Sequence, residues 1–241
     1  MIEVIKENRS KLAVHGLECS GYSLPAGQVG GDFFEFISIN DRIVYTAIGD
    51  VMGKGFQAAC LMEKIRKLLR DCINVNPHPL EVVRRLNKLG GHELRKFRSF
   101  TTLCLLCFDV VARRLTCVNA GHHPPLLLSG GRIKVAECRG IALGLLEDYL
   151  GSGMDEYFLA AGDVVVLYTD GVVEACGPDE QRYGQERLKE VVCLNHGFDA
   201  ERIRTNILAD LDKFTKGIPQ RDDITLVVMK LTEKAGDRGG D

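Results

Sequence analysis

The order in which strand-like and helix-like segments follow one another constrains the fold of this 241-residue chain more than any other feature. Segments of strand length are apolar or alternate between apolar and polar residues, and turn-forming Gly, Asn, Asp and Pro separate them. The turns at 39–42 and 129–132 have the composition of tight hairpins, which favours antiparallel pairing. The expected strands are Phe33–Ile39, Ile43–Ile48, Phe100–Val110, Leu115–Val118, Pro125–Leu128, Tyr157–Ala160, Val164–Tyr168 and Ile224–Leu231.

Two pairs of helices interrupt these strands. Apolar residues recur at helical spacing in Gln57–Ile73 and, less strongly, in Leu80–Leu94. A second pair is expected at Gln185–Leu194 and Ala200–Phe214. Helices with one apolar face bury that face against a sheet, and long series of hairpin strands form sheets that pack face to face. We therefore expect an α+β fold, a four-layer αββα sandwich of two antiparallel sheets flanked by helix pairs.

The length and composition agree with one folded domain over residues 1–241. Of these residues, 45% are hydrophobic and 27% are charged, and a chain of this size buries most of its apolar surface in a single core. We expect residues 1–20 to be a lead-in to the domain. The glycine-rich tail at 235–241 is expected to be disordered.

Charge and hydropathy exclude several classes of partner. The net charge of -2 shows no basic surplus, so nucleic acid is not an expected partner. No run approaches the roughly 20 apolar residues of a membrane span, and the N-terminus carries charges where a signal peptide has its apolar core. These features predict a cytoplasmic protein that does not bind membranes.

The nine cysteines do not have the pattern of a disulfide framework, because their number is odd and several lie in apolar runs. The pair Cys104 and Cys107 has the spacing of a zinc or redox motif. It lies in an expected strand, however, where residues three apart point to opposite faces. We interpret both thiols as packing residues.

Acidic residues stand beside glycine or another acid at the ends of several expected strands. Each has a plain explanation as a turn former. As a group at the ends of neighbouring strands they would repel one another unless cations lay between them. Oxygen ligands select Mg²⁺ or Mn²⁺, and two such ions can activate water and hold a phosphoryl group, so no nucleophilic side chain is needed. The residues are Asp32, Asp50, Asp170, Asp222 and Asp223.

Two further patterns each have a plain alternative. Gly53-Lys54-Gly55 precedes an expected helix whose N-terminus could face an anion, but it lacks the spacing and the Ser/Thr of a Walker A loop. Lys54 is equally compatible with contact to a substrate phosphate and with a solvated loop position. His122 and His123 look like metal ligands, yet adjacent side chains rarely converge on one ion, so a structural role is favoured.

Several motifs, in order from about Gly21 to Leu231, resemble the SpoIIE/RsbU-type branch of the PPM (protein phosphatase 2C-like) superfamily. This resemblance implies the αββα fold, and a serine/threonine protein phosphatase in which two Mn²⁺ or Mg²⁺ ions activate a water molecule. The motif around His122 resembles a family loop that does not hold metal. The motifs are PAGQVGGDFFEF, IGDVMGKGFQAACLM, FTTLCLLCFDV, VNAGHHPPLLL, GIALGL, VVVLYTDGVVEA and DDITLVVM.

The resemblance also implies roles for individual residues. The metal ligands would be the four aspartates Asp32, Asp50, Asp170 and Asp222 with the backbone carbonyl of Val51. Asp223, Gly171 and Lys54 would support the site or contact substrate. Glu35 stands where the family commonly has Asp; because it points away from Asp32 on a regular strand, we expect it to be a supporting or structural residue.

The partners implied are a phosphorylated signalling protein, such as an anti-sigma-factor antagonist in stress response or sporulation, and an activator. The chain could be a domain of a larger sensor protein or a stand-alone phosphatase switched by another protein. The helix pair Gln57–Leu94 is the regulatory candidate. Two other functions stay open. One is a phosphatase-like binding module without turnover, and the presence of every metal aspartate argues against it. The other is a magnesium nucleotide enzyme.

Overall fold

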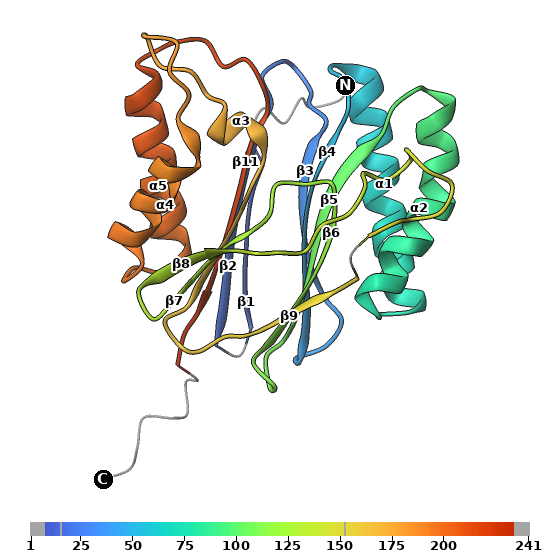
Figure 1. The fold of residues 1–241 in the computed structure, drawn as a ribbon, viewed down its shortest axis with the longest axis horizontal. Helices are drawn as coiled ribbons and strands as arrows, with labels where there is room; N and C mark the ends of the chain where they lie inside the picture. The colour runs from blue at the N-terminus through green and yellow to red at the C-terminus, as the bar shows by residue number, and fades with distance from the viewer. Residues whose placement is uncertain (1–7, 15, 152, 234–241) are drawn as a thin grey trace.

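A computed structural model of the protein describes residues 8–14, 16–151 and 153–233 (Figure 1). Its strands form two sheets, each antiparallel throughout. Sheet A has the order β1-β2-β11-β10-β7-β8 and sheet B the order β3-β4-β5-β6-β9. The strands are β1 (Asn8–Val14), β2 (Leu17–Leu24), β3 (Asp32–Ser38), β4 (Ile43–Val51), β5 (Thr101–Asp109), β6 (Arg114–Ala120), β7 (Leu126–Ser129), β8 (Arg132–Val135), β9 (Asp155–Phe158), β10 (Val164–Tyr168) and β11 (Ile224–Leu231).

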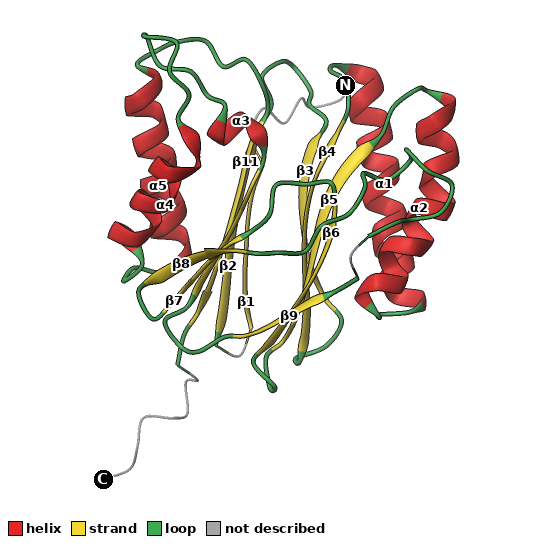
Figure 2. Ribbon diagram, in the orientation of Figure 1, coloured by secondary structure: helices red, strands yellow, loops and turns green. Residues whose placement is uncertain are grey.

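The helices cover the outer faces of the two sheets, as Figure 2 shows. Helices α1 and α2 pack on sheet B, while α4 and α5 pack on sheet A. This is the expected αββα sandwich, so the predicted fold class is confirmed. The helices are α1 (Phe56–Val75), α2 (Pro79–Lys96), α3 (Asp170–Val173), α4 (Gly184–Asn195) and α5 (Ala200–Thr215).

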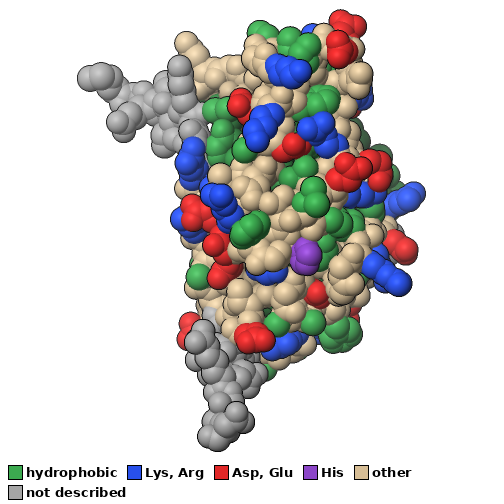
Figure 3. All heavy atoms as spheres, turned by 90° about the vertical axis from the view of Figure 1, so that its left-hand side faces the viewer, with side chains coloured by type: hydrophobic (Ala, Val, Ile, Leu, Met, Phe, Trp, Pro, Cys, Tyr) green, Lys and Arg blue, Asp and Glu red, His purple; other side chains and the backbone are tan. Residues whose placement is uncertain are grey.

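The surface over α4 and α5 carries charges of both signs. Figure 3 views this side of the molecule, where acidic and basic side chains are interspersed with apolar ones. The mixture agrees with the small net charge of -2. No helix within the described residues is long and apolar enough to span a membrane.

Three apolar layers hold the four structural layers together. The central layer lies between the sheets, the second between sheet B and helices α1 and α2, and the third between sheet A and helices α4 and α5. Strand β5 belongs to two of them: Cys104 packs between the sheets and Cys107 packs toward the helices. The two thiols therefore diverge as predicted, and burial on both faces explains the continuous apolar run of this strand.

Both predicted hairpin turns are present. Asn40 Oδ1 accepts hydrogen bonds from the backbone N–H of Arg42 and Ile43, each at 2.9 Å, and so closes the β3–β4 turn. Gly130 and Gly131 join β7 to β8 with φ of 54° and 75°, a conformation that glycine adopts without strain. Local turn chemistry thus sets the register of these two strand pairs.

Within the segment 1–20, expected to be a lead-in, residues 8–14 and 17–20 belong to strands of sheet A, which corrects that prediction for the described part. Strand β2 pairs with β1 and β11, although its sequence LECSGYSL has a weak strand pattern. Gly21 is required there because a Cβ would lie 2.2 Å from the Phe34 ring of the opposite sheet. Strand β8 was also missed, since RIKV is short and mostly polar. The tail predicted to be disordered, 235–241, lies outside the described residues.

Candidate metal centre

Sheet B brings two carboxylates and a backbone carbonyl together at one end of the sandwich. Asp32 begins β3 directly opposite Asp50 on β4, and Val51, the last residue of β4, donates its N–H to the Gly31 carbonyl at 3.2 Å. A Cβ at position 31 would lie 2.5 Å from the Val51 carbonyl oxygen. Glycine at this position therefore allows the start of β3 to approach the end of β4.

Asp32 is held from the opposite sheet. The residue is 7% exposed, and its Oδ2 accepts a 2.8 Å hydrogen bond from Thr169 Oγ1, at the end of β10. Burial and the negative charge of Asp50 raise the pKa of Asp32 well above its usual value. The sequence patterns did not single out Thr169; its place between the end of a strand and Asp170 was the available signal.

Sheet A contributes Asp170 and Asp222. Asp170 is the first residue of α3 and is separated from the end of β10 by Thr169, and Asp222 lies just before β11. Gly171 lets these two segments touch, because a Cβ there would lie 1.9 Å from the backbone oxygen of Asp223. The pKa of Asp170 is raised by burial and by the charge of Asp222. The two acids therefore lie within electrostatic range of each other.

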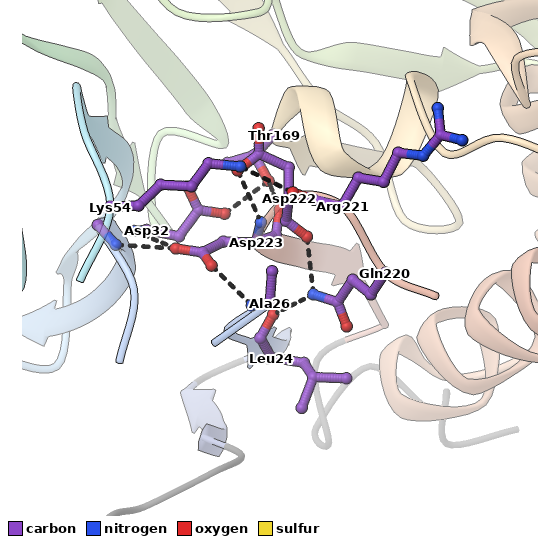
Figure 4. A network of polar contacts seen from close by, with 10 residues as sticks. Leu24, Ala26, Asp32, Lys54, Thr169, Gln220, Arg221, Asp222 and Asp223 are labelled. Carbon is purple, nitrogen blue, oxygen red and sulfur yellow. Dashed lines mark hydrogen bonds and ion pairs between the residues drawn. The ribbon is translucent and has the colours of Figure 1, made fainter. Parts of the chain in front are cut away.

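Asp223 faces backbone amides of the loop before β3 (Figure 4). Its carboxylate accepts hydrogen bonds from Ala26 N and Gly31 N, both at 2.8 Å, and from Asp32 N at 3.4 Å. A Cβ on Gly30 would lie 2.0 Å from Asp223 Oδ2, so this glycine makes room for the carboxylate. Asp223 thereby ties the start of β11 to the loop that carries Asp32.

The pKa of Asp50, on sheet B, is affected by the acids of sheet A, so the acids of the two sheets lie near one another. Burial, followed by the negative charges of Asp170, Asp222 and Asp223, raises this pKa to about 6. A cation bound among such carboxylates would relieve their mutual repulsion and favour their ionised forms. The structure thus brings the predicted aspartates from separate strands to one acidic site.

Lys54 is in contact with this site. Its Nζ lies 3.1 Å from Asp222 Oδ1 and donates to the Arg221 carbonyl at 2.7 Å (Figure 4). The positive charge of the Lys54 ammonium group therefore lies beside the carboxylate of Asp222, at the acidic cluster. Lys54 is nevertheless a loop residue whose side chain is 66% exposed, so both of its interpretations stay open.

Glu35 lies away from the site, which corrects its inclusion among the supporting and substrate-contacting candidates. Its carboxylate is buried on the other face of sheet B and pairs with Arg66 and Arg70 of α1, at 2.5 Å in each case. The structural alternative was the right one. The side-chain alternation of a strand explains the placement, because residues 32 and 35 point to opposite faces.

His122 is a buried structural residue, as the sequence interpretation favoured. Its Nδ1 is 2.8 Å from Thr102 Oγ1, and Asn119 bonds both its backbone N–H and its carbonyl. Burial lowers its pKa to about 3, so the ring is neutral. His123 stacks on Tyr168, with ring centroids 5.5 Å apart, and the two histidine rings lie 6.3 Å apart.

The donor set fits a hard divalent cation, because every predicted ligand atom is a carboxylate or carbonyl oxygen. Because Gly31 has no Cβ, space is left beside the Val51 carbonyl oxygen, which is one of the predicted ligands. Among the residues that the structure describes, no three carboxylate, imidazole or thiol side chains are already close enough to enclose one ion. Side chains of the cluster would therefore have to turn toward a bound cation.

Comparison with known proteins identifies the family to which this chain is related. Residues 40–232 match the family model described as Stage II sporulation protein E (SpoIIE). The phosphoserine phosphatase RsbU of Bacillus subtilis (strain 168) is 28% identical over 216 residues, which make up 89% of this chain and 63% of RsbU. This chain therefore spans less than two thirds of the length of that relative.

Solved structures share the fold. The RsbU and RsbW domains of a Mycobacterium tuberculosis protein superpose with a TM-score of 0.77 at 23% identity, covering 92% of this chain and 61% of that chain. The catalytic domain of the serine/threonine protein phosphatase PstP, solved with 2 manganese ions, gives a TM-score of 0.63 at 17% identity, covering 90% and 99%. Since the family model matches well over half of the residues, from before β4 to beyond β11, this chain belongs to the SpoIIE family.

Proposed function

We propose that this protein is a metal-dependent serine/threonine protein phosphatase. The observation that carries the proposal is the meeting of acids from both sheets at one end of the sandwich, with Asp32 opposite Asp50 and with Asp170 and Asp222 in electrostatic range of Asp50. Similarity to RsbU, which is named a phosphoserine phosphatase, supports the reaction. The retained aspartates favour turnover over a binding module without activity.

The predicted ligands are Asp32, Asp50, Asp170, Asp222 and the Val51 carbonyl. Two Mn²⁺ or Mg²⁺ ions bound there would activate a water molecule and neutralise the charge of the phosphoryl group. The PstP catalytic domain was solved in complex with 2 manganese ions, which supports this stoichiometry.

Other residues of the chain would keep the ligands in place. Thr169 orients the Asp32 carboxylate, and Asp223 holds the backbone before β3 through three amide hydrogen bonds. Lys54, at the edge of the cluster, is positioned to attract an anionic substrate. These contacts preorganise the site before substrate binds.

The substrate is proposed to be a phosphorylated bacterial signalling protein, such as an anti-sigma-factor antagonist. RsbU is named a phosphoserine phosphatase, and the Mycobacterium tuberculosis protein carries an RsbW domain beside its RsbU domain, which supports a role in signalling. An activating protein or sensor domain, the regulatory role of α1 and α2, and the cytoplasmic location stay predictions.

The first prediction concerns Asp170. Asp170→Asn should lower metal-dependent phosphate release at least about 100-fold, because a neutral amide is a poor ligand for Mn²⁺ or Mg²⁺. Release from a phosphoserine peptide and from p-nitrophenyl phosphate would be measured with each metal and with EDTA. Circular dichroism should show an unchanged fold.

Asp179→Asn, in the exposed turn after α3, is the matched control and should keep full activity. Full activity in Asp170→Asn would exclude the proposed metal site. A wild-type protein that releases no phosphate under any metal, with or without candidate activators, would instead favour the phosphatase-like binding module.

A further inference from the structure

A hollow of about 400 Å³ opens next to the acidic cluster and has no role in the function proposed above. It lies between β2, α3, α5 and the loop before β11, and two of its lining residues are Asp170 and Asp222. Most of the rest of its wall is apolar. Apolar side chains from β2, α5 and the loop before β11 line it, including Tyr22, Leu24, Leu208, Leu211 and Ile218.

The lining of this hollow also carries charged side chains of both signs, among them Arg182, Arg221, Glu174 and Asp212. Arg221 belongs to the loop before β11, and its Nη1 lies 3.8 Å from Sγ of Cys176, in the segment after α3. In Figure 4 the Arg221 side chain points away from Asp223. Arg182 also lines the hollow, where it pairs with Glu174 at 2.7 Å. An apolar lining next to Asp170 and Asp222 suits a ligand that combines a phosphate with an apolar group.

We infer that this hollow binds the apolar side chain of a residue that neighbours the phosphorylated residue in the substrate. The inference rests on the proposed phosphatase function, which places the phosphoryl group at Asp170 and Asp222. Successive residues of an extended peptide are roughly 3.3–3.6 Å apart, so a flanking side chain would reach a hollow that shares those two aspartates. Burial of an apolar side chain there is favourable because it leaves water.

The hollow on the other side of the same loop has a different character. It measures about 650 Å³ and is lined by residues 26–30, by Lys54 to Phe56, and by Gln220, Arg221 and Asp223. Gln220 and Arg221 line both hollows and so form the ridge between them. The apolar selection is assigned to the first hollow because the proposed ligands Asp170 and Asp222 line it, whereas Asp223 is the only acid of the cluster that lines the second.

The test compares phosphoserine peptides that differ at one flanking position. Peptides with Leu or Gly immediately before, or immediately after, the phosphoserine would be assayed with Mn²⁺. We expect kcat/KM to be about tenfold higher for Leu than for Gly on one of the two sides. Equal values on both sides would overturn the inference.

Variants then assign the preference to the hollow. Ile218→Ser should reduce the Leu-to-Gly ratio of kcat/KM to below about threefold, and Leu208→Ala should reduce it as well. Leu194→Ser is the matched control, because Leu194 is 81% exposed on α4 outside the hollow, and it should keep the tenfold ratio. Each ratio compares two substrates on one protein, so a general loss of active protein cancels. A preference unchanged in both Ile218→Ser and Leu208→Ala would overturn the assignment.

Failure of the proposed function would look different. In that case no phosphopeptide and no p-nitrophenyl phosphate would be hydrolysed with Mn²⁺ or Mg²⁺. Fluorescence polarisation of the same labelled peptides would then test the hollow by itself, with a tenfold lower Kd expected for the Leu peptide. Equal Kd values for the Leu and Gly peptides would overturn the inference without reference to turnover.

Discussion

The carboxylates of the acidic cluster have different surroundings, and these surroundings indicate different roles. Asp32 is buried and accepts a hydrogen bond from Thr169, whereas Asp223 faces three backbone amides. The side chain of Asp222 is 51% exposed and has Lys54 beside it. Asp222 is therefore the carboxylate of the cluster with the most freedom to turn toward a cation.

Lys54 should weaken cation binding, because its ammonium group competes with the metal for Asp222. We expect Lys54→Met to tighten Mn²⁺ binding about two- to fivefold, which corresponds to about 0.4–1 kcal/mol, the usual range for an exposed ion pair. Isothermal titration with Mn²⁺ in the absence of substrate measures this directly.

Lys64→Met is the control for that prediction. Lys64 pairs with Glu93 at 2.9 Å between α1 and α2, and its loss removes the same charge from a position outside the cluster. Its Mn²⁺ affinity should equal that of the wild type. Unchanged or weaker binding by Lys54→Met would contradict the proposed competition.

At the scale of secondary-structure elements, α1 is attached to sheet B by charge as well as by apolar packing. Glu35 on β3 is 8% exposed and accepts hydrogen bonds from two arginines one turn apart on α1. Because strands β3 and β4, which carry proposed ligands, lie under this helix, the contact connects the helix to the face of the sheet opposite the site.

Glu35→Gln should lower the free energy of unfolding by about 1–3 kcal/mol, because it leaves Arg66 and Arg70 without their buried carboxylate. Urea unfolding provides the measurement. Glu63→Gln is a matched control, since Glu63 also pairs with Arg66 but is 60% exposed, and should cost less than about 0.5 kcal/mol. Equal effects of the two substitutions would contradict the role given to Glu35.

The turn between β5 and β6 is predicted to lose stability in acid. Arg42, together with the backbone N–H groups of Ala112 and Val111, lowers the pKa of Asp109 to about 2. A carboxyl whose pKa is lower in the folded state stabilises the fold above its unfolded pKa of about 3.9. That contribution disappears as pH falls from about 4 to about 2.

The difference in unfolding free energy between the wild type and Asp109→Asn should therefore be largest above pH 5 and shrink toward pH 2. Urea titrations at several pH values measure it. Asp179→Asn, an exposed residue, controls for the loss of one negative charge. A difference that stays constant from pH 6 to pH 2 would show that the pair does not act through the ionised carboxylate.

At the scale of the whole molecule, the proposed function depends on how closely the two sheets approach. The proposed ligands come from both sheets, and the Thr169–Asp32 hydrogen bond crosses between them. Gly21 of β2 and Phe34 of β3 face each other in the central layer, where a Cβ on Gly21 would lie 2.2 Å from the Phe34 ring. A larger residue at either position must change the spacing or displace the ring.

Gly21→Ala should therefore destabilise the fold by about 1–3 kcal/mol through overpacking. Adding Phe34→Leu should recover part of this loss, so the two substitutions should not be additive. Gly27→Ala is the control, because the nearest atom to its Cβ would be 3.8 Å away. Additive effects in urea unfolding would show that the two residues do not limit the sheet spacing.

Much of the fold was predictable from local patterns. The expected ranges of β10 and β11 agree with the structure, and α1, α2, α4 and α5 differ from prediction by no more than a few residues. Their apolar periodicity is strong because each packs against a sheet or forms its buried centre. Strand β2 escaped prediction because Gly21 and Ser23 suit contacts with other strands. Gly21 leaves room for the Phe34 ring, and the hydroxyls of Ser23 and Thr225 form a 2.8 Å hydrogen bond.

The sequence by itself determined which aspartates are candidate cation ligands, since aspartates beside glycines mark the ends of the strands, and the αββα order follows from periodicity. Only the tertiary structure decided which of these residues meet. Contacts of Asp32 with Thr169, of Lys54 with Asp222, and of Glu35 with α1 join residues 31 to 168 positions apart. Such contacts depend on the packing of the two sheets and their helices, which local sequence patterns do not encode.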